Sequence, residues 1–199
     1  MSNEVFQLMK QLDTDTVEMQ IVLQCAPVLA GLKVSNLLNI KSKQGKDVGI
    51  NVNKKGISMY ILADNGYKMS VLVYREEELK KYLSDEKVIK MLYGIGYKSD
   101  DLMKLLGDFA KRYRDYLDGF IDFPHEMGLF LGYPLEDVKG FIDNKGKNFL
   151  CSGYWKVYAN MPEKIELFKK FQKAEEILMR KLYFERMYHG NSARREGYR

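Results

Sequence analysis

The sequence of 199 residues predicts a mostly helical α+β fold. Two β-rich runs, GISMYILA and YKMSVLVY, flank Asp64-Asn65-Gly66, where Gly66 can take a positive φ and Asn65 tolerates one. They predict a β-hairpin at about 57–74. Long stretches of helical periodicity follow, and a shorter β-rich pair at about 148–159 predicts a second pair of strands.

The segment before the hairpin begins with an apolar stretch at 16–31 that predicts one helix or two short ones. Pro27 lacks the N–H that a continuous helix uses, so we expect a kink or a restart beside it. Gly31 is a typical helix stop. Residues 34–40 form a second short apolar piece, and the polar, glycine-containing residues 41–55 predict an exposed loop.

Helices are predicted from the hairpin onwards. Glutamates at 76–78 suit the positive end of a helix dipole, and a second short helix is expected at 86–94. Ser99 is expected to cap a long amphipathic helix that ends near Gly119. Its apolar residues recur every three or four positions, at Leu102, Leu105, Leu106, Phe109 and Tyr113.

Two further helical regions are predicted towards the C-terminus. Residues 122–146 indicate two short helices with Pro124 and Pro134 at early positions, where a helix accepts proline. Asn160 is the expected N-cap of a long last helix. The pattern fades after about Tyr188, so we predict one globular domain at 1–188 and a basic, disordered tail at 189–199.

Composition restricts the class of protein. Hydrophobic residues make up 46% and charged residues 30% of the chain, which excludes a disordered protein, a collagen or a disulfide scaffold. There is no apolar run long enough to span a membrane, and the polar, acidic start lacks the features of a signal peptide. We therefore expect a cytoplasmic protein with no membrane partner, in which Cys25 and Cys151 are free thiols.

The net charge of +5 is unevenly distributed. Residues 25–75 hold 8 basic and 2 acidic side chains, and residues 164–199 hold 10 and 5, whereas the rest of the chain is acidic. The basic blocks fit either a solvated surface or docking to an anionic partner. Nucleic acid is an unlikely partner, because no recognition motif is present and the acidic middle interrupts any basic face.

The common cofactor motifs are absent from the sequence. There is no GxxxxGK[ST] phosphate loop, no GxGxxG and no CxxC. His125-Glu126 does not begin an HExxH zinc motif, because position 129 is Leu. A metal site built from Cys25, His125, Glu126 and Cys151 has no support in their spacing, so no metal is predicted and any cofactor stays unknown.

The strings FPHE at 123–126 and GYPLED at 132–137 are the strongest candidates for a site. In the first turn of a helix, His125 would stay neutral and could act as a base or a ligand. Glu126 would face a different direction and could act as a separate base. The structural alternative is that His125 caps a turn and Glu126 bonds to backbone N–H groups.

Three residues elsewhere could complete that site. Cys25 is a candidate nucleophile if a cation such as Lys33 or Arg75 lowers its pKa, and a pair with His125 is possible. Lys33 and Arg75 could also bind a carboxylate or a phosphate. The alternatives are a buried structural thiol at Cys25 and a solvent-exposed pairing of Arg75 with the glutamates at 76–78.

Aromatic residues concentrate in the same part of the chain. Tyr133 and Trp155, with Tyr154 and Tyr158, could line a pocket or stack on a planar ligand. A place in the core of a helix or strand face is the alternative.

Four strings carry a resemblance to a known family. CAPVLAGLK, VYR, FPHEMGLFLGYPLEDVKGFI and NKGKNFLCSGYWKVY resemble an uncharacterised family of clostridia-like anaerobic bacteria, domain of unknown function family 3793. The resemblance covers roughly 17–175. It implies no activity, and an association with flavodoxin or iron transport is the most that it suggests. It does single out Cys25, Lys33, Arg75, His125, Glu126, Tyr133, Asp137 and Trp155 among its motif residues.

Two hypotheses follow for the function. The first is a domain that binds or transforms an anionic small molecule, in a cleft where the FPHE and GYP strings meet Cys25 and Arg75. Its candidate catalytic residues are His125, Glu126 and Cys25, and its candidate ligand-binding residues are Lys33, Arg75, Tyr133 and Trp155. The alternative is a non-catalytic accessory protein that docks an acidic redox or iron-linked partner such as flavodoxin.

Overall fold

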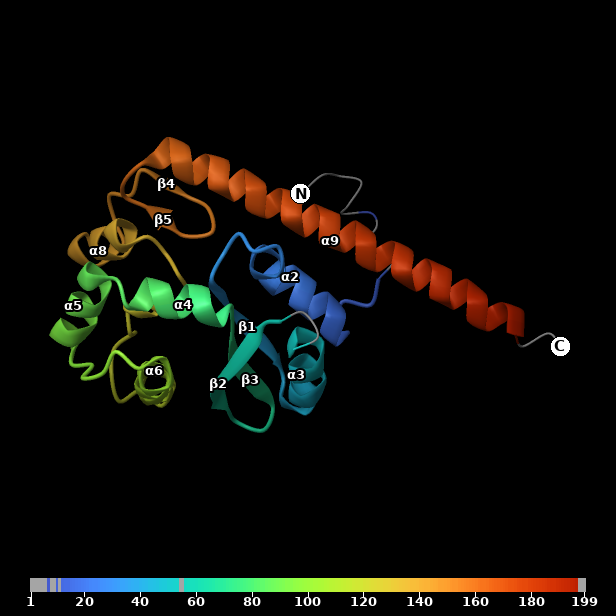
Figure 1. Cartoon of the computed structure of the whole chain (residues 1–199), viewed down its shortest axis with the longest axis horizontal. Helices are drawn as coiled ribbons and strands as arrows, with labels where there is room; N and C mark the ends of the chain where they lie inside the picture. The colour runs from blue at the N-terminus through green and yellow to red at the C-terminus, as the bar shows by residue number, and fades with distance from the viewer. Residues whose placement is uncertain (1–6, 8–9, 11, 54–55, 197–199) are drawn as a thin grey trace.

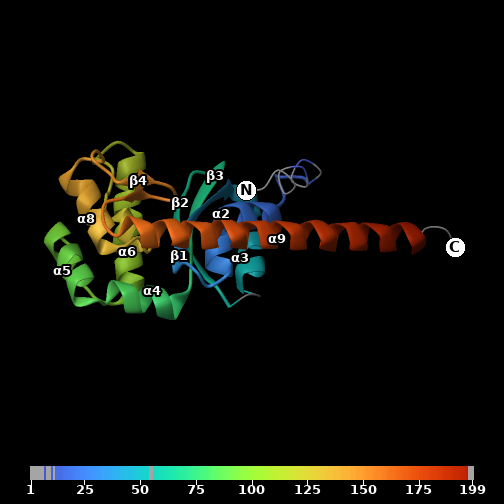
Figure 2. The ribbon, with the colours of Figure 1, turned by 90° about the horizontal axis from the view of Figure 1, so that it is seen from above.

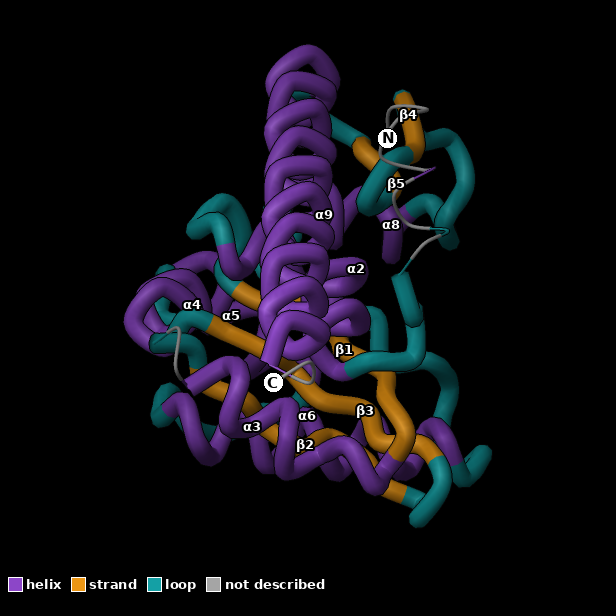
Figure 3. The backbone as a smooth tube through the Cα atoms, turned by 90° about the vertical axis from the view of Figure 1, so that its right-hand side faces the viewer, coloured by secondary structure: helices purple, strands orange, loops and turns teal. Residues whose placement is uncertain are grey.

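A three-stranded antiparallel sheet lies at the centre of the computed structural model, which describes residues 7, 10, 12–53 and 56–196 (Figure 1). Its strands are β1 (Ser35–Lys41), β2 (Ser58–Asp64) and β3 (Lys68–Tyr74), in the order β1-β3-β2 (Figure 3). The predicted hairpin is confirmed: Gly66 has a φ of +84°, and the Asn65 side chain accepts hydrogen bonds from two following backbone N–H groups.

The central strand β3 divides the core into two halves, because alternate side chains of a strand face opposite sides of a sheet. Met69, Val71 and Val73 pack with the helix α2 (Val17–Leu29) and with Val48 of α3 (Gly45–Asn53). Leu72 and Tyr74 pack on the other side, against the helices α4 (Glu76–Leu83), α5 (Glu86–Ile95) and α6 (Leu102–Leu117). The sheet is thus buried on both faces.

The predicted exposed loop at 41–55 is wrong, because this segment contains the short 3₁₀ helix η1 (Ser42–Gln44) and α3. The apolar piece at 34–40, to which the sequence assigned no element, forms the edge strand β1. The glycines explain the error in the loop. A Cβ at Gly45 would lie 2.9 Å from the Met69 Cε, and one at Gly49 would lie 3.4 Å from the Met59 Sδ. These glycines therefore allow α3 to approach the sheet closely, rather than marking a loop.

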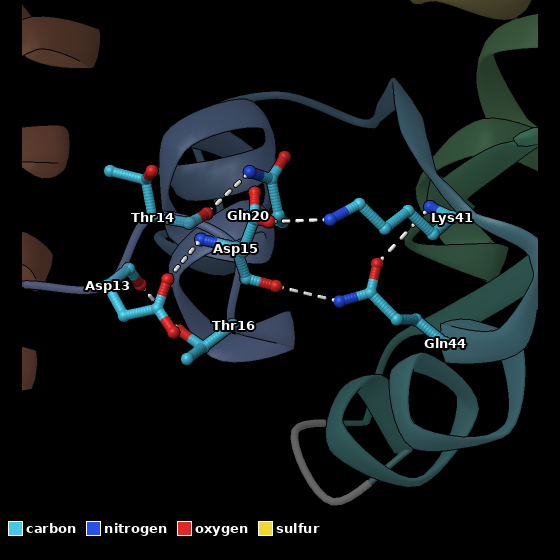
Figure 4. Close-up of polar contacts among 7 residues, drawn as sticks. All are labelled: Asp13, Thr14, Asp15, Thr16, Gln20, Lys41 and Gln44. Carbon is cyan, nitrogen blue, oxygen red and sulfur yellow. Dashed lines mark hydrogen bonds and ion pairs between the residues drawn. The ribbon is translucent and has the colours of Figure 1, made fainter.

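Polar contacts join the start of α2 to the end of β1 (Figure 4). Lys41 Nζ lies 2.5 Å from Asp15 Oδ2, and Gln44 Nε2 donates to the Asp15 carbonyl at 2.7 Å. Gln20 Nε2 donates to the Thr14 carbonyl at 2.6 Å. From this anchor α2 runs as one helix through Pro27 to Leu29, so the expected restart at the proline does not occur.

The helices on the other side of the sheet follow the prediction, with a different cap for α6. Asp101, not Ser99, is the N-cap residue, and its Oδ1 accepts a hydrogen bond from the Lys104 N–H at 2.9 Å. Ser99 instead accepts one from the Asp101 N–H. The two short helices expected at 122–146 are α7 (Met127–Phe130) and α8 (Leu135–Asp143), with Pro134 as the N-cap of α8.

The C-terminal part consists of the predicted strand pair and the predicted long helix. Strands β4 (Cys151–Ser152) and β5 (Lys156–Val157) pair antiparallel and precede α9 (Met161–Glu196). Near its start, α9 packs on the strand pair through Phe168 and Phe171. Further along, Met179 and Leu182 pack on α2.

The C-terminal end of α9 projects beyond the other elements (Figure 2). The helix continues past the predicted boundary at Tyr188 to Glu196, and residues 197–199 of the predicted tail lie outside the described residues. A separate tail therefore stays a prediction. Among the described helices, none combines the length and the apolar character needed to cross a membrane.

Candidate functional site

An aromatic cavity of about 280 Å³ lies between the segment 123–141 and the strand pair β4–β5. The aromatic rings of Phe123, Tyr133, Phe141, Tyr154 and Trp155 contribute to its lining. His125, Asp137 and Lys156 supply its charged or titratable groups. We call this space the aromatic cavity. It brings together two strings of sequence, FPHEMGLFLGYPLEDVKGF and YWK.

The turn between α7 and α8 fixes the ring of Tyr133. Gly132 has a φ of +67°, and a Cβ there would lie 2.2 Å from the Val34 Cγ2, so any other residue would be strained and would displace Val34. The Tyr82 hydroxyl donates to the Tyr133 carbonyl at 2.5 Å. The Tyr133 ring then stacks on Trp155, with ring centroids 4.9 Å apart.

Asp137 joins α8 to the strand pair. Its carboxylate accepts hydrogen bonds from the Trp155 indole N–H at 2.7 Å and from the backbone N–H groups of Tyr158 and Ala159 at 2.7 and 3.2 Å. Only 2% of Asp137 is exposed. A buried carboxylate with three donors is a strong anchor, because hydrogen bonds to charged groups exceed neutral ones in strength. Asp137 therefore holds the wall of the cavity that carries Trp155.

His125 lies exposed at the edge of the aromatic cavity. Its ring lies between Phe123 and Phe141, at centroid distances of 5.5 and 5.3 Å. The expected place in the first turn of a helix is wrong, because His125 belongs to the turn before α7, which begins at Met127. Across the cavity edge, Lys156 Nζ donates to the Gly146 carbonyl at 2.7 Å.

Glu126 does not share the aromatic cavity with His125. Its Oε1 lies 2.5 Å from the Arg112 Nε and accepts a hydrogen bond from the Tyr97 hydroxyl at 3.3 Å. Burial, together with the charge of Glu126, raises the pKa of Tyr97. Glu126 is thus the buried member of an ion pair with the partly exposed Arg112, and it does not line the aromatic cavity.

Lys33 does not line the cavity but lies close to the ring of Tyr133. Its Nζ donates to the Asn36 Oδ1 and lies 5.0 Å from the centroid of the Tyr133 ring. Only 7% of Lys33 is exposed, and this burial lowers the pKa of its ammonium group to about 7. Lys33 therefore supports Tyr133 from the side of α2.

Cys25 is fully buried in the core between α2 and the sheet. Burial raises the pKa of its thiol to about 12, although the nearby Lys33 acts in the opposite direction. It does not line the aromatic cavity with His125. This is the environment of a structural cysteine, and not that of an activated nucleophile.

Arg75 also lies away from the cavity. Arg75 is the N-cap residue of α4 and forms an ion pair with Glu78 at 2.8 Å, which is the alternative to a binding role that its neighbouring glutamates predicted. The cavity therefore does not lie where the FPHE and GYP strings meet Cys25 and Arg75. Of the predicted residues, the structure gathers His125, Tyr133 and Trp155 at the cavity, while Lys33 reaches it only through Tyr133.

Three charged residues near the cavity were not proposed as site residues from the sequence. Asp137 has a local signal, since it is an acidic residue in the first turn after Pro134. Arg112 follows the core residue Phe109 by three positions, which places it at the edge of the apolar face of α6. Lys156 has no local signal. Within the described residues, no group of three or more His, Cys, Asp or Glu side chains could hold a metal ion.

The fold and the site together define an α+β domain with an aromatic cavity beside a short strand pair. A family model with the description "Protein of unknown function (DUF3793)" matches residues 21–189. The chain therefore belongs to this family, as its sequence strings indicated. No curated protein and no solved structure gave a match.

Proposed function

We propose that this domain binds a small, mostly apolar ligand that carries an acidic group. The aromatic cavity is the observation that supports this proposal. Ligand sites are concave and mostly apolar, with a few polar groups that set the orientation of the ligand. Here aromatic rings form the walls, while His125 and Lys156 at the edge can donate hydrogen bonds to an anion.

Binding is the activity that the geometry supports, rather than a covalent reaction. Nucleophilic catalysis needs a nucleophile and a base within hydrogen-bond reach of each other. Cys25, the predicted nucleophile, is fully buried between α2 and the sheet. Glu126, the predicted second base, forms an ion pair with Arg112. Of the three candidate catalytic residues, His125 alone lines the aromatic cavity.

The single tryptophan of the chain makes the proposal testable. Trp155 lines the cavity, so its indole N–H resonance in an NMR spectrum reports on ligand in the cavity. We expect 3-phenylpropionate to shift this resonance. His125→Ala should weaken binding about tenfold, the equivalent of one hydrogen bond to a charged group. Thermal stability should hardly change, because His125 is exposed.

Phe120→Ala is the matched control, because Phe120 is 78% exposed and does not line the cavity. It should leave both affinity and stability unchanged. Unfolding of the His125→Ala variant would assign His125 a structural role. Wild-type affinity in that variant would remove His125 from the proposed site.

Docking of an acidic protein is a second candidate, favoured by the projecting end of α9 (Figure 2). The segment 164–199 carries 10 basic and 5 acidic residues, so a complex with an acidic partner should weaken steeply as salt rises. Flavodoxin is the partner that the family resemblance suggested. Its binding should disappear when the chain is truncated after Tyr188, and binding that ignores salt would contradict this candidate.

A further inference from the structure

A second cavity, of about 310 Å³, adjoins the aromatic cavity. Phe123 and His125 line both and form the wall between them. The second cavity differs in chemistry, because Arg112, Glu126 and Asp122 line it together with three isoleucines. We call it the charged cavity. Its residues come from α5, α6, the segment 121–126 and α8.

The ion pair in the charged cavity leaves hydrogen-bonding groups unused on both of its members. Arg112 bonds Glu126 through Nε and has the Tyr97 side chain as a further hydrogen-bond partner, which leaves other N–H donors of its guanidinium unused. Glu126 accepts two hydrogen bonds on Oε1, whereas its Oε2 accepts none from a described residue. Since Glu126 is 2% exposed, this is an unpartnered oxygen on a deeply buried carboxylate that lines a cavity.

Such a pair matches a zwitterion better than a simple anion. The terminal nitrogens of a guanidinium bind a carboxylate in a planar, bidentate manner. The free carboxylate oxygen beside them would repel a lone anion, but it can accept a hydrogen bond from an ammonium group. A ligand with both groups on neighbouring atoms satisfies Arg112 and Glu126 together.

We propose that the two cavities form one site for an α-amino acid with a large apolar side chain. In this arrangement, Arg112 binds the carboxylate of the amino acid and the Oε2 of Glu126 accepts a hydrogen bond from its ammonium group. The side chain passes the wall of Phe123 and His125 and lies among the rings of the aromatic cavity. This inference rests on the proposed function, since it requires that the aromatic cavity holds the apolar part of a ligand.

Three related probes separate the two polar contacts. L-phenylalanine has both charged groups, 3-phenylpropionate lacks the ammonium group, and phenethylamine lacks the carboxylate. We expect L-phenylalanine to bind at least tenfold more tightly than either fragment, measured by titration of the Trp155 indole resonance. Arg112→Gln should weaken the binding of the two probes that carry a carboxylate tenfold or more and leave the binding of phenethylamine unchanged. Glu126→Gln should weaken the binding of the two amines and strengthen that of 3-phenylpropionate, because the variant lacks the negative charge that repels its carboxylate.

Two further variants guard against loss of the fold. Arg112→Gln leaves Glu126 as a lone buried charge, which is destabilising, so the double variant Arg112→Gln/Glu126→Gln removes both charges at once. It should bind all three probes with the same weak affinity. Lys111→Gln makes the same charge change on an exposed residue of α6 and should alter no affinity.

The outcomes separate this inference from the proposed function. If the folded variants weaken all three probes equally, or change none of them, the amino-acid site is overturned while the aromatic cavity remains a binding site. If no probe shifts the Trp155 resonance of the folded wild-type protein, both proposals are overturned.

Discussion

Lys33 lies in a buried environment that disfavours its charged form. Its Nζ is buried, has the Asn36 side chain as a hydrogen-bond partner, and forms no ion pair with a described carboxylate. Desolvation disfavours the charged form of a lysine, which is the cause of its lowered pKa of about 7. In the unfolded chain the ordinary lysine pKa of about 10.4 returns. The difference makes the stability of the protein depend on pH.

The stability of the wild-type protein should rise with pH relative to a Lys33→Met variant. Between pH 7 and 10 the unfolded state binds more protons at Lys33 than the folded state, so the free energy of unfolding increases with pH. In urea unfolding between pH 7 and 9, the free energy of unfolding of Lys33→Met minus that of the wild type should decrease by up to about 1.4 kcal/mol per pH unit. Burial raises the pKa of Cys25 in both proteins, whereas the opposing effect of Lys33 on that thiol is present in the wild type alone.

Lys80→Met provides the control for this measurement, because Lys80 is exposed on α4. The difference in free energy of unfolding between Lys80→Met and the wild type should stay constant over the same pH range. If the free energy of unfolding of Lys33→Met relative to the wild type were also constant with pH, then folding would not lower the pKa of Lys33.

At the scale of elements, the sequence predicted those elements that depend on neighbouring residues, such as the hairpin. It did not predict those that depend on contacts between distant residues, such as α3. The hairpin β2–β3 depends on a turn whose residues are adjacent in the sequence, so Asn65 and Gly66 were sufficient to predict it. The helix α3 depends on contacts of Gly45 and Gly49 with Met69 and Met59. Glycine is a helix breaker in isolation, and only the approaching sheet makes it favourable there.

The joint between α8 and the strand pair should depend strongly on Asp137. Asp137→Ala removes the acceptor of three buried N–H groups, and we expect it to lower the free energy of unfolding by about 2–4 kcal/mol. The emission of Trp155 should shift to the red as its indole becomes solvated. Glu136→Ala, at the exposed neighbouring carboxylate that pairs with Lys164, should cost about 0–1 kcal/mol. Equal costs for the two variants would contradict the anchoring role of Asp137.

At the scale of the whole molecule, the contrast between local sequence signals and long-range packing explains how much of the site could be predicted. His125, Tyr133 and Trp155 lie within one short stretch of sequence that folds on itself, so a dense string of aromatic and polar residues was sufficient to locate them. Cys25 and Arg75 lie on α2 and at the start of α4, whose distance from that stretch depends on how the sheet and helices assemble. Arg112 comes near Glu126 only because α6 packs beside the 121–126 turn.

The long helix α9 joins the strand pair at one end of the molecule to α2 at the other, and its contribution to stability should be divided along its length. Met179 and Leu182 are buried against α2, and Arg186 bonds the Thr16 hydroxyl at 2.6 Å. Truncation after Ile177 removes all three contacts and should lower the free energy of unfolding by about 3–6 kcal/mol, from the two apolar side chains alone. Truncation after Tyr188 keeps them and should leave urea unfolding nearly unchanged. If the longer fragment were as unstable as the shorter one, the projecting end of α9 would contribute to the core, and α2 would not be the main partner of this helix.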